Sequence, residues 1–211
     1  MKMMKWQFVP VVLLLSFLAY GMFSWYENEY NRLPVYGQIL PGTRQEKAHY
    51  IRPFNLINQE NAIAGTQAWK DKIVVVNFFF THCASICPKM TVNLQEVQHA
   101  YKNDNKVLIN SLTVDPEADS VSQLRQYRKR FGIQSDKWQL LTGSKKDIYR
   151  LARNEFLLVA TDGDGGPNDF IHSDKVVLID PEKRIRGYYN GTDKQEIHQL
   201  MLDIKKLQHE N

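Results

Sequence analysis

The chain has 211 residues, a length that suits one domain and a short additional segment. Apolar residues make up 43% of it, enough for a compact core, so the body of the chain is not a disordered tail. The formal net charge is +4, and Lys and Arg alternate with Asp and Glu along most of the chain. The chain has no basic block of the kind that binds a phosphate backbone, so nucleic acid is not an expected partner.

The N-terminus carries an uncharged run from Trp6 to Tyr26, preceded by Lys2 and Lys5. A helix of about 20 apolar residues is long enough to span a hydrocarbon core. Lysines on the N-terminal side favour a cytoplasmic N-terminus, so we expect a single-pass membrane protein whose remainder faces the periplasm or another extracytoplasmic side. The alternative is a signal peptide that is cleaved at the small-x-small sequence of residues 19–21.

Three parts of the chain are expected from these patterns. Residues 1–26 form the cytoplasmic N-terminus and the transmembrane anchor. Residues 27–48 form a linker, because Pro and Gly punctuate this stretch and no apolar period persists. Residues 49–211 form the folded domain.

The folded part alternates between strand-like and helix-like patterns. Residues 50–57 alternate as a strand does, and the β-branched and aromatic run at 73–80 is typical of a strand covered on both faces. Further strands are expected at 107–114, 138–141, 176–179 and 184–189, and helices at 90–101, 120–131, 144–154 and from 193 onward. This order predicts an α/β thioredoxin-like fold: a central mixed sheet flanked by helices, with an added N-terminal strand region and a β-hairpin.

The two cysteines, Cys83 and Cys87, follow the predicted strand 73–80 at the point where the next helix begins. Ligands usually bind in the crevice beyond the carboxyl ends of such strands, and a helix N-terminus lowers the pKa of a nearby thiol. The alternatives are a plain stabilising disulfide and two inert buried cysteines. A bridge this short removes little chain entropy, and the polar flanking residues disfavour full burial, so the pattern favours a working dithiol.

A metal site at the dithiol needs another ligand. Two thiolates with one imidazole suit copper, whereas structural zinc usually has four protein ligands. His172 is a candidate for the third position, because it lies between the glycine-rich stretch 162–167 and the predicted strand 176–179. The alternative, which its position alone leaves open, is that His172 is an ordinary histidine of a surface loop.

Four ordered blocks closely resemble the Sco/SenC family. The first is the stretch 78–88, Phe-Phe-Phe-Thr-His-Cys-Ala-Ser-Ile-Cys-Pro, and the others are at 113–117, 138–143 and 170–180. The similarity spans about residues 50–205 and extends to the N-terminal anchor. This chain departs from many members at Ala84 and Ser85, where they have Pro-Asp, and neither position is a ligand.

The resemblance implies a thioredoxin fold, a membrane tether, and a copper ion bound by Cys83, Cys87 and His172. It implies a metallochaperone that serves the dinuclear copper centre of cytochrome c oxidase subunit II, or a similar acceptor, with an upstream copper donor or thiol reductant. The alternatives are a thiol–disulfide oxidoreductase, in which Cys83 and Cys87 form a redox-active pair that keeps acceptor cysteines reduced, and a copper or redox sensor. A peroxidase is a weaker alternative.

Overall fold

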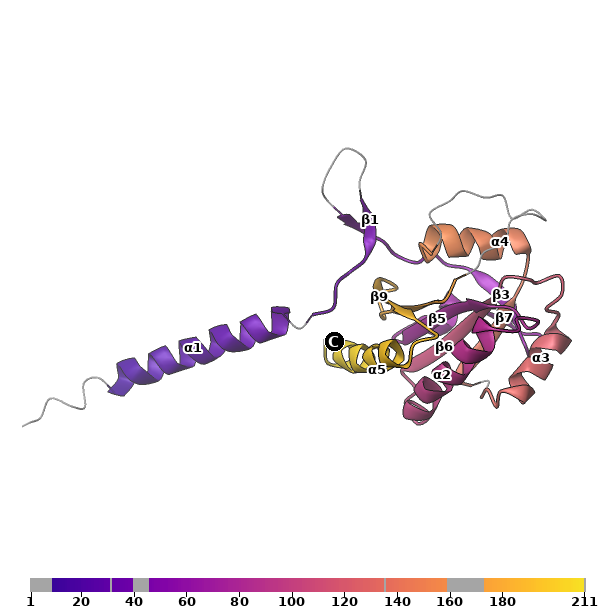
Figure 1. The fold of residues 1–211 in the computed structure, drawn as a ribbon. Coiled ribbons are helices and arrows are strands. Elements are labelled where there is room, and N and C mark those ends of the chain that lie inside the picture. The colour runs from indigo at the N-terminus through magenta and orange to yellow at the C-terminus, as the bar shows by residue number, and fades with distance from the viewer. Residues whose placement is uncertain (1–8, 31, 40–45, 135, 159–172, 211) are drawn as a thin grey trace, which may run out of the picture.

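We describe a computed structural model of the chain. It describes residues 9–30, 32–39, 46–134, 136–158 and 173–210. An N-terminal helix, α1 (Val9–Tyr30), precedes an α/β domain, and a two-stranded sheet, β1 (Gly37–Ile39) with β2 (Glu46–Ala48), lies between them in the sequence (Figure 1).

The centre of the domain is a sheet of seven strands in the order β4-β3-β7-β6-β5-β8-β9. The three central strands, β5, β6 and β7, are parallel, and every other pairing in this sheet is antiparallel. The strands are β3 (Asn55–Asn58), β4 (Ile63–Gly65), β5 (Ile73–Phe79), β6 (Val107–Thr113), β7 (Trp138–Thr142), β8 (Lys175–Ile179) and β9 (Ile185–Asn190). The predicted mixed sheet is therefore confirmed.

Helices cover both faces of this sheet (Figure 1). They are α2 (Ile86–Ala100), α3 (Val121–Arg130), α4 (Lys145–Arg150) and α5 (Lys194–His209), with a 3-10 turn at Thr66–Trp69 and a π-helical turn at Leu151–Glu155. Every residue of β5 is buried, because successive side chains point to opposite faces of the sheet and each face is covered by a hydrophobic core. Val75 packs with Leu94 of α2 and Leu200 of α5, whereas Val76 packs with Ile148 of α4 on the other face.

The strand predicted at 50–57 is shorter and later in the structure, where β3 spans Asn55–Asn58. It continues into β4 through a turn in which Asn58 Oδ1 accepts from the backbone N–H groups of Glu60 and Ala62. The predicted hairpin of β8 and β9 is confirmed. Lys183 completes its turn with a positive φ of 66° and donates its N–H to Asp180 O at 2.9 Å.

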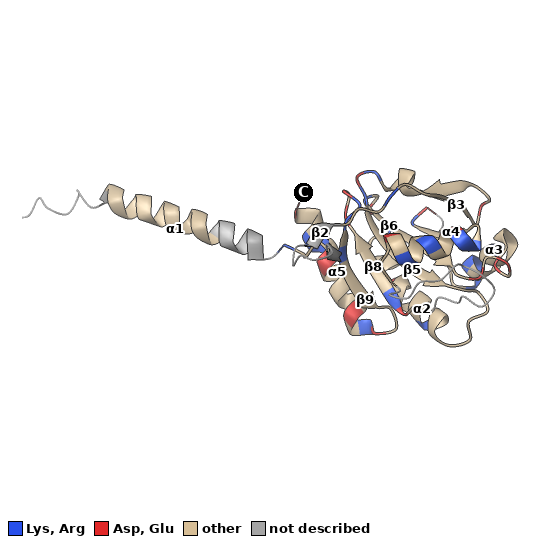
Figure 2. Ribbon diagram, turned by 90° about the horizontal axis from the view of Figure 1, so that it is seen from above, with Lys and Arg blue, Asp and Glu red and all other residues tan. Residues whose placement is uncertain are grey.

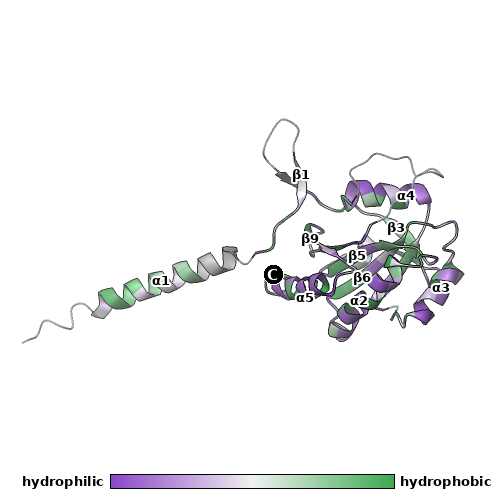
Figure 3. Ribbon diagram, viewed as in Figure 1, coloured by the Kyte–Doolittle hydropathy of each residue, from purple (hydrophilic) through white to green (hydrophobic). Residues whose placement is uncertain are grey.

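The N-terminal segment is helical, as the sequence predicts, and its described apolar side chains are exposed, including Leu13 and Phe17. Figure 3 shows the apolar character of the coloured part of α1, and Figure 2 shows charged residues distributed over the α/β domain. Within the part of the chain that the structure describes, no helix has both the length and the apolarity that a membrane crossing needs. The predicted membrane-spanning helix is therefore not confirmed.

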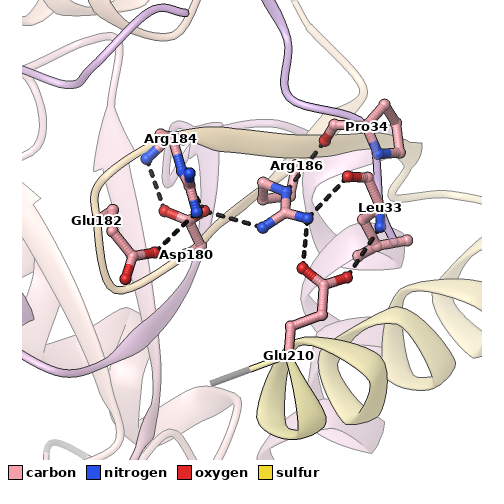
Figure 4. Close-up of polar contacts among 7 residues, drawn as sticks. All are labelled: Leu33, Pro34, Asp180, Glu182, Arg184, Arg186 and Glu210. Atoms are coloured by element: carbon pink, nitrogen blue, oxygen red, sulfur yellow. Dashed lines mark hydrogen bonds and ion pairs between the residues drawn. The ribbon is translucent and has the colours of Figure 1, made fainter. Parts of the chain in front are cut away.

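Part of the stretch predicted as a linker is attached to the domain through Arg186 of β9, whose side chain is 4% exposed (Figure 4). Its guanidinium donates to the backbone oxygens of Leu33, at 2.7 Å, and Pro34, at 3.1 Å. The same group pairs with Asp180 at 3.0 Å and with Glu210 at 2.6 Å. Leu33 N–H also donates to Glu210 at 2.9 Å. One buried arginine thus joins the chain after α1, the β8–β9 turn and the end of α5.

Candidate metal centre

The two cysteines lie at the carboxyl end of β5, where the chain turns into α2. Cys87 is in the first turn of α2 and is 3% exposed, whereas Cys83 is partly buried in the preceding loop. Both are free thiols, and the backbone N–H of Cys87 points at Cys83 Sγ, 3.3 Å away. Cys83 therefore sits at the N-terminal end of α2, before the helix rather than within its first turn.

The surroundings separate the two thiols chemically. Burial raises the pKa of Cys83, but hydrogen bonds to its sulfur from Cys87 and from the backbone of Ser85 and Ile86 outweigh this effect, so its pKa lies below the usual value. Burial, together with the neighbouring Cys83 and the charge of Asp119, raises the pKa of Cys87 to about 12. Cys83 is thus the thiol that ionises first.

His172 lies outside the described residues, and the structure describes the chain again from Ser173. Ser173 and Cys87 line the same small cavity of about 10 Å³, together with phenylalanines at the end of β5, Ile86 and Val114. The chain next to His172 therefore returns to the dithiol, because Ser173 is its immediate neighbour in sequence.

Three other histidines of the described chain, His49, His82 and His198, have partners of their own. His82 is exposed, and its Nδ1 lies 3.8 Å from Asp119. His49 Nε2 is 2.8 Å from the backbone oxygen of Glu155, and His198 lies 3.5 Å from Glu96. Among the residues that the structure describes, no group of three or more His, Cys, Asp and Glu side chains is arranged to hold a metal ion. Within the described residues, the dithiol therefore offers two sulfur atoms, without a third side chain of these types arranged beside them.

Sequence reasoning missed Asp119, a fully buried carboxylate that holds the start of the cysteine loop. It accepts from the backbone N–H of Thr81 at 3.0 Å and from the hydroxyl of Thr113. The sequence signal that could have found Asp119 is its position shortly after β6, because the carboxyl ends of the parallel strands β5 and β6 lie at the same sheet edge. Nothing in the local pattern distinguishes it from the other acidic residues near it, because its burial depends on the packing of three segments.

The fold and the dithiol at the carboxyl edge of its sheet define a thioredoxin-like α/β protein. The SCO1/SenC family model matches residues 42–208, so the chain belongs to that family.

Curated relatives agree with this assignment. The SCO1 protein homolog of Bacillus subtilis is 29% identical over 157 residues, which cover 74% of this chain and 81% of the relative. A SCO2-like protein of Rickettsia prowazekii is 30% identical over 175 residues, which cover 79% of this chain and 82% of the relative.

Solved structures share the fold. A SCO1/SenC family lipoprotein from Bacillus anthracis superposes with a TM-score of 0.67 at 29% identity, over 76% of this chain and 95% of that one. BsSco, a member of the Sco family of cytochrome c oxidase assembly proteins in which a disulfide switch was identified, has a TM-score of 0.64 at 28% identity, with coverages of 75% and 93%. Copper-bound ScoI of Arabidopsis thaliana has a TM-score of 0.60 at 26% identity, with coverages of 76% and 99%.

Proposed function

We propose that this protein is a copper metallochaperone that binds a copper ion as cargo through Cys83, Cys87 and His172. Its acceptor in this proposal is the dinuclear copper centre of cytochrome c oxidase subunit II, or a similar site. Two relatives support it: the Arabidopsis ScoI structure contains copper, and BsSco belongs to a family of cytochrome c oxidase assembly proteins.

The observation that carries the proposal is the cavity that Cys87 shares with Ser173. Because Ser173 lines this cavity, the residue that follows His172 in the sequence lies at the same sheet edge as Cys87. Two thiolates and one imidazole form a soft ligand set that suits copper. Cys83, whose pKa is lowered, supplies a thiolate readily, and Cys87 loses its proton when the metal binds, because a coordinating thiol is deprotonated.

Copper titration of the reduced, full-length chain tests this site. Copper(I) binding is expected at one ion per chain, and replacing both cysteines with alanine should abolish it. With copper(II), the sulfur-to-copper charge-transfer band should change in His172→Ala, because the third ligand is lost. His82→Ala tests the histidine beside Cys83, and His198→Ala is a control on α5; both should leave the band unchanged. If the band is unchanged in His172→Ala but changes in His82→Ala, the ligand assignment is contradicted.

A thiol–disulfide oxidoreductase is the second candidate, and the separation of the two thiol pKa values favours it. Here the Cys83 thiolate attacks a substrate disulfide, forms a mixed disulfide and releases one substrate thiolate. Cys87 then loses its proton and attacks Cys83, which releases the second substrate thiolate and leaves the Cys83–Cys87 disulfide. An external thiol must reduce that disulfide before the next cycle. Because this chemistry needs no imidazole ligand, His172→Ala should keep reductase activity while copper transfer falls.

We also propose that α1 associates the protein with a membrane and that the α/β domain faces the extracytoplasmic side. The exposed apolar side chains along α1, such as Leu13 and Phe17, support this proposal, because a helix that is apolar all round is covered by lipid or protein. Membrane fractionation of cells that express the full chain, compared with residues 49–211 alone, is the test. Recovery of the full chain in the soluble fraction would contradict it.

A further inference from the structure

The carboxylate of Asp119 joins three segments at the edge of the sheet where the cysteines lie. Its Oδ1 accepts from the Thr81 hydroxyl at 2.5 Å, and its Oδ2 accepts from the Thr81 N–H at 3.0 Å and from the Thr113 hydroxyl. Thr81 begins the cysteine loop, and Thr113 is the last residue of β6. Asp119 itself immediately precedes Ser120, the N-cap of α3.

These contacts hold the loop that presents Cys83. Val114 N–H donates to Phe79 O at 2.8 Å and fixes the end of β5, and Asp119 holds the next segment through Thr81. Cys83 N–H then donates to Phe80 O at 3.3 Å, which turns its sulfur toward the first turn of α2. The position of Cys83 therefore depends on a hydrogen bond made two residues earlier.

Asp119 also brings a negative charge into a buried place. The side chain is fully buried, its hydrogen-bond donors are neutral, and the nearby His82 ring is exposed and 3.8 Å away. Water and counter-ions screen a buried charge poorly, so it acts on its neighbours more strongly than a surface carboxylate does. It disfavours further negative charge on the dithiol, and it contributes to the raised pKa of Cys87.

We infer that Asp119 is a positioning residue for the dithiol, one that holds the Cys83 loop through Thr81 and ties it to the end of β6 through Thr113. This inference rests on the proposed copper site, and it adds a residue that touches neither the metal nor the sulfur. Groups beyond the direct ligands commonly affect metal affinity by about 10- to 100-fold.

The main test is copper(I) competition between the reduced, full-length chain and a chromophoric chelator such as bicinchoninate. Asp119→Asn should weaken copper(I) binding by about tenfold, because the amide nitrogen cannot accept the hydrogen bonds that a carboxylate oxygen accepts and the Cys83 loop loosens. Thr81→Val keeps the backbone hydrogen bond to Asp119 and removes the contacts of the hydroxyl with Asp119 and His82, so it should weaken binding in the same direction but by less. Asp115→Asn is the matched control, since it removes an equal charge at the end of β6 from a residue that is only partly buried, and it should change the affinity less than twofold.

A second measurement needs no metal. The Cys83–Cys87 disulfide is equilibrated with dithiothreitol, which gives up two electrons and two protons and becomes a cyclic disulfide while the protein dithiol forms. If Asp119 holds the loop, Asp119→Asn should shift this equilibrium toward the disulfide, because Cys83 loses the hydrogen bond from Cys87 N–H that its position in the loop allows. A shift toward the dithiol by about tenfold, or about 30 mV, would mean that the charge of Asp119 acts and not the position of the loop, and would overturn the inference.

The outcomes separate this inference from the copper proposal. If the wild-type chain does not bind copper(I), the proposed function fails, and the disulfide equilibrium still tests Asp119. If the wild type binds tightly and Asp119→Asn binds equally well, or if Asp115→Asn loses as much affinity as Asp119→Asn, the inference is wrong. Asp119→Ser, a neutral residue that fits the same space, replaces Asp119→Asn should that variant not fold, and its expected shifts are the same.

Discussion

The backbone N–H of Cys87 donates a hydrogen bond to the sulfur of Cys83 at 3.3 Å, so the first turn of α2 supports one cysteine with the backbone of the other. A helix N-terminus stabilises negative charge, and the pKa of Cys83 is correspondingly lowered. The dithiol is therefore asymmetric before any metal or substrate arrives.

This asymmetry predicts different alkylation rates. At pH 7 the reduced chain should react with iodoacetamide mainly at Cys83, because its thiolate forms at a lower pH than that of an ordinary cysteine. As the pH rises from 6 to 9, the rate at Cys83 should approach its plateau at a lower pH than an ordinary cysteine does, whereas Cys87, with a pKa raised to about 12, should stay slow throughout. Peptide mass spectrometry measures both sites. In denaturant the two rates should become similar, and equal rates in the folded chain would contradict the prediction.

Metal removal should restore this reactivity. If copper(I) is bound by both sulfurs, one equivalent should protect Cys83 from iodoacetamide, because a coordinated thiolate has its lone pair engaged by the metal. A copper(I) chelator in excess should return the alkylation rate to that of the metal-free chain. A copper-loaded protein that is alkylated at Cys83 as fast as the metal-free protein would show that this sulfur is not a ligand.

The buried ion pairs of Arg186 predict a large loss of stability. Arg186→Ala leaves Glu210 without its arginine partner and Asp180 with Arg184 alone, so the free energy of unfolding should fall by about 3 kcal/mol in urea. The backbone N–H of Leu33 should also exchange faster with solvent. Lys194→Ala is the control, because Lys194 is exposed and lies 3.7 Å from Glu96; it should change stability by less than about 1 kcal/mol.

The two faces of α2 predict opposite sensitivities to truncation. Leu94 is fully buried in the core between the sheet and α5, and Leu94→Ala should cost about 3 kcal/mol through lost burial and the cavity left behind. Val92 on the same helix is 48% exposed, and Val92→Ala should cost less than about 1 kcal/mol. Urea unfolding measures both, and similar losses would mean that α2 does not pack as described.

The sequence predicted the parts of the fold whose signals are local. The β-branched and aromatic run of β5, the spacing of Met90, Leu94 and Val97 in α2, and the Asp-Pro turn between β8 and β9 each appear within a few residues of chain. The sequence did not predict the three-residue strands β1, β2 and β4, because a strand of three residues is too short to show a period.

By itself, the sequence determined that the chain forms an α/β domain of this family, with two cysteines between a buried strand and a helix, since strand and helix periods and motif spacing are properties of neighbouring residues. Only the tertiary structure decided which cysteine ionises first, which arginine holds the N-terminal segment, and that Asp119 lies beneath the cysteine loop. Burial and hydrogen bonding arise when segments distant along the chain pack together, and these determine pKa values and the strength of a buried charge. Ser173 lies beside Cys87 for the same reason, because the sheet brings β8 against β5.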